Sequence, residues 1–152
     1  MPVEVLAPGD WRRWRDLRLE ALKDTPIGFG ELYADAVLRS DDEWREHAEL
    51  PGTRVLSYDG SGLLGMAGGF VGEDGSPVLF GVYVRPSARG GDVLAELVGA
   101  VAAWAAPVPL VLHVHEDNHR AVRAYEKLGF ALTGDRREGA GIDGRDLLRM
   151  AR

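Results

Sequence analysis

The sequence of 152 residues contains no cysteine, which excludes disulfides, thiolate metal sites and cysteine nucleophiles together. It also lacks a long uninterrupted apolar run. The most apolar stretch, residues 93–114, contains one glutamate and two prolines, and this favours a core helix followed by a buried strand over a membrane span. The first ten residues show no basic segment followed by an apolar run, so we expect no signal peptide and a cytoplasmic location.

Positive charge is scarce as well. Eighteen Lys and Arg face 24 Asp and Glu, a net charge of −6. Affinity for nucleic acids depends mainly on neutralising their phosphates, so a protein with a net negative charge is not expected to bind them. The same charge mildly favours cationic small molecules as substrates. The four histidines lack the carboxylate-rich helical spacing of metal ligands, so we predict no metal site.

What the sequence does contain is enough for one domain over residues 1–152, because apolar residues make up 45% of a chain of typical domain length. The first 50 residues predict a short strand at 3–6 and then helices. Asp10 is expected to cap a first helix whose apolar residues recur at three- and four-residue spacing: Trp11, Trp14, Leu17, Ala21 and Leu22. A weaker helical stripe covers 31–38, and Ser40 with Glu43 forms a capping box for a third helix.

Strand patterns begin near residue 54. Three strand-like runs separated by Gly- and Asp-rich turns predict an antiparallel meander, at 54–58, 63–71 and 78–84. A helix over 92–105 and a strand over 110–115 follow, and this order implies a parallel crossover. A helix capped by Asn118 and ended by Gly129 comes next, and runs at 130–133 and 147–151 close the chain as a hairpin. The fold class predicted is α/β (α+β), a mixed sheet that is partly parallel.

The junction at residues 82–93 runs from a strand through a glycine turn into a helix. Unpaired amides and the helix dipole at such a junction attract an anion, although an ordinary strand-to-helix turn would have the same composition. Neither a Walker lysine nor Gly-x-Gly-x-x-Gly is present, so nucleoside triphosphate and dinucleotide sites match poorly. Further along, Asn118 and Tyr125 lie two helical turns apart on one edge, where they either face one ligand or serve as a cap and a core aromatic.

With these two motifs the chain resembles the GNAT superfamily of acyl-CoA-dependent N-acyltransferases. That family reads Arg or Gln, x, x, Gly, x, Gly or Ala after its fourth strand, and Asn, x, x, Ala, x, x, x, Tyr in a later helix that Gly-Phe follows. The second pattern matches residues 118–130 well. The resemblance implies a mainly antiparallel sheet with a central splayed parallel strand pair and flanking helices. It also implies transfer of an acetyl group from acetyl-CoA, without a metal, to a primary amine of a small molecule or peptide, by direct attack in a ternary complex.

Carried over to this chain, the resemblance assigns the cofactor contacts to three segments. The CoA pyrophosphate is expected on the amides of Arg89, Gly90, Gly91, Asp92, Val93 and Leu94, the pantetheine arm along Val82, Tyr83 and Val84, and a further contact at Asn118. Tyr125 is expected to donate a proton to the leaving thiolate. Gly81 suits the bulge that such enzymes use to separate two parallel strands.

One position departs from the family pattern. Aligned without gaps, the two small residues of the first motif fall on Asp92 and Leu94, and a carboxylate at a helix start competes with a phosphate, so we expect weakened acetyl-CoA binding. Asp92 is also the best argument for a rival reading, a non-catalytic acyl-CoA sensor or partner-binding module. A module without chemistry would not need Tyr125, which favours the enzyme.

The acceptor site is less defined by the sequence. The strand at 78–84 holds no acidic residue to act as a base, and His113 and His115, which share one strand face, are either candidates for that role or structural histidines. Glu31 and Tyr33 lie where the family commonly walls its acceptor site. A small amine, amino acid, polyamine, antibiotic or protein N-terminus all remain open as acceptors, and a homodimer is compatible with the sequence.

Overall fold

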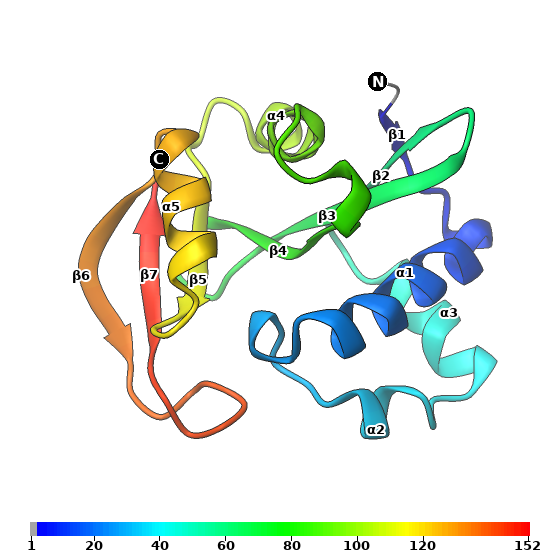
Figure 1. The fold of residues 1–152 in the computed structure, drawn as a ribbon, viewed down its shortest axis with the longest axis horizontal. Helices are drawn as coiled ribbons and strands as arrows, with labels where there is room; N and C mark the ends of the chain where they lie inside the picture. Colours follow the sequence, from blue (N-terminus) through cyan, green and yellow to red (C-terminus); the bar gives the residue numbers. More distant parts are fainter. Residues whose placement is uncertain (1–2) are drawn as a thin grey trace.

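The structure is a computed structural model that describes residues 3–152. Its centre is one seven-stranded sheet with the order β1-β2-β3-β4-β5-β7-β6, in which β4 and β5 are the parallel pair and the other described neighbours run antiparallel (Figure 1). The strands are β1 (Val3–Val5), β2 (Thr53–Asp59), β3 (Gly62–Val71), β4 (Pro77–Val84), β5 (Val111–His115), β6 (Ala131–Arg137) and β7 (Leu147–Ala151). The predicted meander, parallel crossover and closing hairpin are confirmed.

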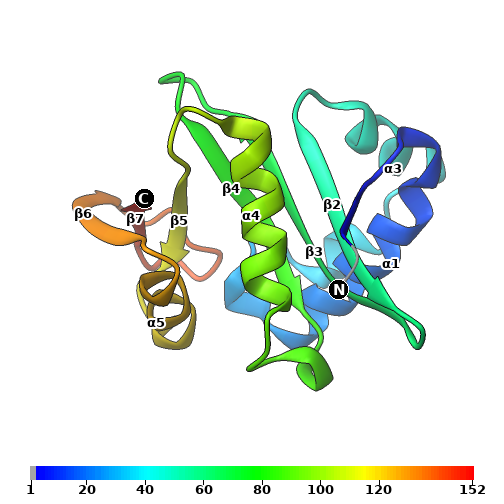
Figure 2. The ribbon, with the colours of Figure 1, turned by 90° about the horizontal axis from the view of Figure 1, so that it is seen from above.

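Helices cover both faces of this sheet (Figure 2). The α-helices are α1 (Trp11–Asp24), α2 (Tyr33–Ala36), α3 (Asp41–Glu49), α4 (Val93–Ala105) and α5 (His119–Lys127), and short 3₁₀ turns are η1 (Pro8–Asp10), η2 (Pro26–Gly28) and η3 (Pro86–Ala88). The first three α-helices bury their apolar residues on one face, and α4 and α5 pack on the other. Within residues 3–152, no helix has both the length and the apolar character to cross a membrane.

Side-chain caps are present at the starts of α3 and α5 and absent at the starts of α1, α2 and α4. All five apolar residues of the predicted first helix are buried, and Ser40 caps α3 by accepting a hydrogen bond from the Glu43 amide at 3.2 Å. The expected side-chain cap by Asp10 is wrong: the residue precedes α1 but forms no capping bond. Its backbone (φ −93°, ψ 21°) belongs to η1 instead of the extended region that capping geometry requires. The second helix is shorter than predicted, and the sixth strand is longer, reaching Arg137.

The parallel strands separate soon after they meet. Only Val78 and Val111 pair between β4 and β5. On the other side of β4, the register with β3 shifts between Met66 and Gly68, where β4 has one more residue than its partner. Gly81 occupies this bulge with φ of +63°, a left-handed conformation that glycine adopts without strain. The bulge and the splayed pair expected from the sequence are therefore present.

Candidate active site

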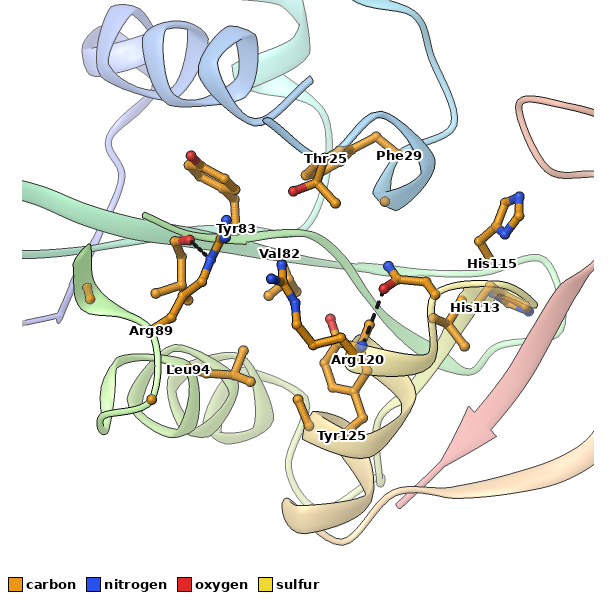
Figure 3. Close-up of a pocket in the computed structure, with 18 of the residues that line it drawn as sticks. Thr25, Phe29, Val82, Tyr83, Arg89, Leu94, His113, His115, Arg120 and Tyr125 are labelled. Atoms are coloured by element: carbon orange, nitrogen blue, oxygen red, sulfur yellow. Dashed lines mark hydrogen bonds between the residues drawn. The ribbon is translucent and has the colours of Figure 1, made fainter. Parts of the chain in front are cut away.

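A cavity of about 240 Å³ opens where β4 and β5 separate (Figure 3). Its walls come from the ends of both strands, the starts of α4 and α5, and the η2 turn. The lining residues are Thr25, Gly28, Phe29, Val82, Tyr83, Val84, Ala88, Arg89, Gly90, Gly91, Leu94, His113, Val114, His115, Asn118, Arg120, Ala121, Ala124 and Tyr125. Segments from three distant parts of the sequence, residues 25–29, 82–94 and 113–125, therefore meet at one opening.

Most residues expected to bind the cofactor lie in this lining. They are Val82, Tyr83, Val84, Arg89, Gly90, Gly91, Leu94 and Asn118, and Tyr125 joins them. Asp92 and Val93 do not line the cavity: the first is exposed, and the second is fully buried against the core of α4. A main-chain amide can bind a ligand while its side chain points elsewhere. The amides of Asp92 and Val93 therefore stay candidates for the pyrophosphate, although their side chains do not line the cavity.

The β4 wall offers main-chain groups. Beyond Val78, β4 forms no described pairing with β5, so the β5-facing edge of residues 82–84 is left for a ligand. One carbonyl is already used, because Val84 accepts a hydrogen bond from Nε of Arg89 at 2.9 Å. The same guanidinium also bonds the carboxylate of Asp24, and this bond lowers the Asp24 pKa. Arg89 therefore ties the loop before α4 to the β4 wall and to the end of α1.

The start of α4 forms the second wall. Gly90 has φ of +81°, a conformation that favours glycine, and it turns the chain so that the first amides of α4 follow at once. Asp92 occupies the N-cap position, yet its side chain makes no capping bond. The unpaired amides of the first helical turn and the positive end of the dipole are thus available to an anion.

The start of α5 supplies the third wall and a cation. Asn118 caps the helix by accepting a hydrogen bond from the Ala121 amide at 3.3 Å. Arg120 extends over the cavity in Figure 3 and forms no hydrogen bond or ion pair at contact distance within the described chain. Neither sequence motif includes this arginine as a functional position. A basic residue in the first turn of a helix, where the dipole disfavours it, was the available signal.

Tyr125 lies deeper in the same wall. Its ring packs edge-on against Phe130, with ring centroids 5.8 Å apart, and its burial raises the pKa of the phenol above the ordinary value. Because the folded-state pKa is raised, the hydroxyl keeps its proton at neutral pH. The arrangement provides a neutral proton donor at the cavity wall.

The two histidines of β5 differ in their bonding. His115 has Nε2 2.8 Å from a carboxylate oxygen of Asp143, while its Nδ1 accepts a hydrogen bond from the Asp117 amide at 3.0 Å. Both ring nitrogens are engaged, which fits a structural histidine. The pKa of His113 is lowered by burial and by two nearby arginines, so this imidazole is neutral at neutral pH.

A group of possible metal ligands is also present, which the sequence did not predict. One atom each of His115, Asp117 and Asp143 lie within 4.8 Å of one another. In this bonding pattern, however, the Nδ1 lone pair of His115 accepts from an amide and Nε2 donates to Asp143, so no nitrogen lone pair points to an ion. These residues therefore fit a hydrogen-bonded loop anchor better than a metal centre.

The two residues expected to wall the acceptor do not line this first cavity. Glu31 lines a second cavity, where Arg18 and Arg39 bind its carboxylate. Tyr33 lines neither cavity and packs under the ammonium of Lys23, 4.5 Å from its ring centroid. Phe29, which lies before them in the chain, is the aromatic residue that reaches the first cavity.

Comparison with known proteins gives a consistent result. The profile of the Acetyltransferase (GNAT) family matches residues 11–130. A Salmonella typhimurium protein described as an acetyltransferase, with its cofactor acetyl-CoA, has a similar fold (TM-score 0.76, 18% identity, 100% of this chain and 92% of that chain). So do a Vibrio cholerae spermidine N-acetyltransferase in complex with CoA and spermine (0.73, 20%, 99% and 94%) and an aminoglycoside 6'-N-acetyltransferase complexed with coenzyme A (0.70, 17%, 100% and 96%). No curated protein sequence matches this chain significantly.

Proposed function

We propose that this chain, which belongs to the acetyltransferase (GNAT) family, transfers an acetyl group from acetyl-CoA to a primary amine. The observation that carries the proposal is the cavity at the β4–β5 separation. It combines an unpaired strand edge, a helix start and the neutral phenol of Tyr125, which suit the pantetheine arm, the pyrophosphate and the leaving thiolate of acetyl-CoA. Similar folds that hold acetyl-CoA or CoA add support.

The residues present fit acetyl-CoA along its length. The pyrophosphate is an anion, and the amides at the start of α4 and the cation of Arg120 form the positive end of the cavity. The amides of the pantetheine arm match the open main-chain edge of residues 82–84, in the manner of an added strand. When bound, acetyl-CoA supplies the activated thioester carbonyl.

The chain's own groups then account for the reaction. The acceptor nitrogen attacks the thioester carbonyl, a C–N bond forms, and the C–S bond breaks as the thiolate leaves. A main-chain amide near Val82 is suited to polarise the carbonyl. Tyr125 donates its O–H to the leaving thiolate, directly as a proton or by a hydrogen bond, and its raised pKa means that the phenol is protonated at neutral pH. His113, a neutral imidazole in the same cavity, accepts the proton that the amine loses.

The rival function, a sensor or partner-binding module without catalysis, has less support in this geometry. The feature that supports it is the carboxylate of Asp92, which at the start of α4 competes with the pyrophosphate of CoA. That side chain is exposed and does not line the cavity. We therefore favour the enzyme.

The test is a thiol-release assay with acetyl-CoA and a panel of primary amines, with mass spectrometry of the products. We expect at least one amine to gain an acetyl group while one equivalent of CoA thiol appears. If acetyl-CoA binds and no amine of a broad panel is acetylated, the sensor reading replaces the enzyme.

A further inference from the structure

A second cavity, of about 300 Å³, lies on the sheet face covered by α1, α2 and α3. Its lining comes from α1, α3, β2, β4 and the segments on either side of α2, and consists of Trp14, Arg18, Gly30, Glu31, Arg39, Trp44, His47, Arg54 and Phe80. Three arginines thus face one space that contains a single carboxylate. The groups that set its charge are these four side chains and one histidine.

Glu31 is fully used within this set. Nε of Arg18 donates to Oε1 of Glu31 at 3.0 Å, and both terminal nitrogens of Arg39 donate to the same carboxylate, Nη1 at 3.1 Å. Each of these three side chains is at most 20% exposed. One negative charge therefore faces two buried positive charges, and this leaves one positive charge in excess before the third arginine is considered.

Arg54 is the most buried of the arginines, with 8% of its surface exposed. Its Nη1 donates to the carbonyl of Leu50 at the end of α3, at 3.2 Å, and its guanidinium lies 5.9 Å from the ring of Trp14 and 5.8 Å from that of Phe80. No carboxylate within residues 3–152 forms an ion pair with it, and its other N–H groups have no acceptor there. The aromatic rings hold the guanidinium in place and leave part of its donor edge toward the cavity.

The last group facing the cavity cannot supply the missing negative charge. His47 is neutral or positive, and burial together with the neighbouring Arg39 lowers its pKa. The cavity therefore carries an excess of two positive charges at neutral pH. A buried cation without a counter-ion is unfavourable, and the planar fork of a guanidinium matches a carboxylate, so the site is suited to an anion supplied by a ligand.

This cationic cavity approaches the reaction site. The guanidinium of Arg18 stacks 4.6 Å above the ring of Phe29, and Phe29 lines the first cavity. A Cβ placed on Gly81 would lie 3.3 Å from the ring of Trp14 and 3.7 Å from Nη1 of Arg18. Gly81 lines neither cavity, but Phe80 before it lines the cationic cavity and Val82 after it lines the first one, so the β4 bulge lies between the two.

We propose that the acceptor is a primary amine that carries a carboxylate, such as an amino acid, with the carboxylate bound by Arg54 and its neighbouring arginines and the amine directed to the bulge at Gly81. This inference rests on the proposed acetyltransferase function. It separates this chain from structural neighbours named for spermidine and aminoglycosides, which are polycations that three arginines would repel. It also replaces the expectation, drawn from the net charge, that cationic acceptors are favoured.

The experiment compares L-phenylalanine and L-leucine with their α-amides and with spermidine, at saturating acetyl-CoA. We expect kcat/KM to favour each free carboxylate over its amide by about tenfold or more, mostly through KM, which is the scale of one charge-assisted recognition contact. Arg54→Gln should remove the preference and Arg54→Lys should restore part of it. The matched control is Arg45→Gln on the outside of α3, which loses the same charge and should keep the preference.

Preference for amides or for spermidine, with thiol release intact, overturns the inference while leaving the acetyltransferase function in place. A second measurement needs no turnover: calorimetric titration with N-acetyl-L-phenylalanine and with its α-amide. Tighter binding of the carboxylate, lost in Arg54→Gln, supports the anion site even if no amine is acetylated, and equal affinity contradicts it. If Arg54→Gln fails to fold, the comparison of carboxylate with amide on the unmodified protein still decides.

Discussion

Replacing Tyr125 with phenylalanine removes one oxygen atom and keeps the ring that packs against Phe130. The phenol forms no hydrogen bond with the described residues, so the variant should lose less than about 1 kcal/mol of unfolding free energy. Proton donation by a positioned side chain contributes about 10²- to 10⁴-fold to a rate. We therefore expect kcat to fall by that range, about 3 to 5 kcal/mol of transition-state stabilisation.

The assay for this variant is thiol release at saturating acetyl-CoA, with calorimetric binding of acetyl-CoA measured in parallel. Tyr58→Phe, on β2 and outside the cavity, is the matched control and should keep full turnover. Binding of acetyl-CoA to Tyr125→Phe should change little, since the lost group acts on the leaving thiolate. If turnover falls by only about threefold or less, the loss is far smaller than expected and refutes the role of Tyr125 as proton donor.

Three further predictions follow from the same geometry. Arg120→Gln should weaken acetyl-CoA binding by about tenfold at low salt and less at high salt, because a partly exposed cation is screened, whereas Arg123→Gln on the outer side of α5 should not; calorimetry at two ionic strengths checks both. His113→Asn should remove the fall of kcat/KM at low pH. Because the pKa of His113 is lowered, this fall should begin only below the ordinary histidine range in the unmodified protein, and a fall that persists in the variant contradicts the role of His113 as base. Gly81→Ala should cost roughly 1 to 3 kcal/mol of stability, because φ is +63° and the new Cβ meets Trp14 at 3.3 Å, while Gly60→Ala, with open space around it, should not; an unchanged melting temperature for the first would show that the bulge adapts.

Local signals in the sequence account for much of the fold. The three- and four-residue spacing of Trp11, Trp14, Leu17 and Ala21 is a property of the helix itself, so it could be recognised without knowing what the helix packs against. The capping box at Ser40 and the cap at Asn118 are local in the same way. Asp10 occupies the N-cap position of α1, as its residue type suggests, but the 3₁₀ turn sets its backbone angles and its side chain makes no capping bond.

The chemistry of the two cavities was only partly predictable, for a physical reason. Residues of the cofactor wall follow one another along β4 and into α4, so a short motif contains them. The cationic cavity is different, because Arg18, Arg39 and Arg54 come from α1, the segment after α2, and β2, and no spacing rule relates them. The net charge of −6 gives no sign of these arginines either, because it is a sum over the whole chain and does not report the charge inside one cavity.

The central claim, that acetyl-CoA binds where β4 and β5 separate, is tested most directly by calorimetric titration of acetyl-CoA and of CoA. The unmodified protein and Asp92→Gly should be measured side by side. We predict micromolar binding, about −8 kcal/mol, by the unmodified protein. For the glycine variant we predict binding tighter by less than about 1 kcal/mol, because the Asp92 carboxylate acts at the helix start from an exposed position. No detectable binding by the unmodified protein, with binding restored in Asp92→Gly, would contradict the account and favour a GNAT fold that no longer uses acetyl-CoA.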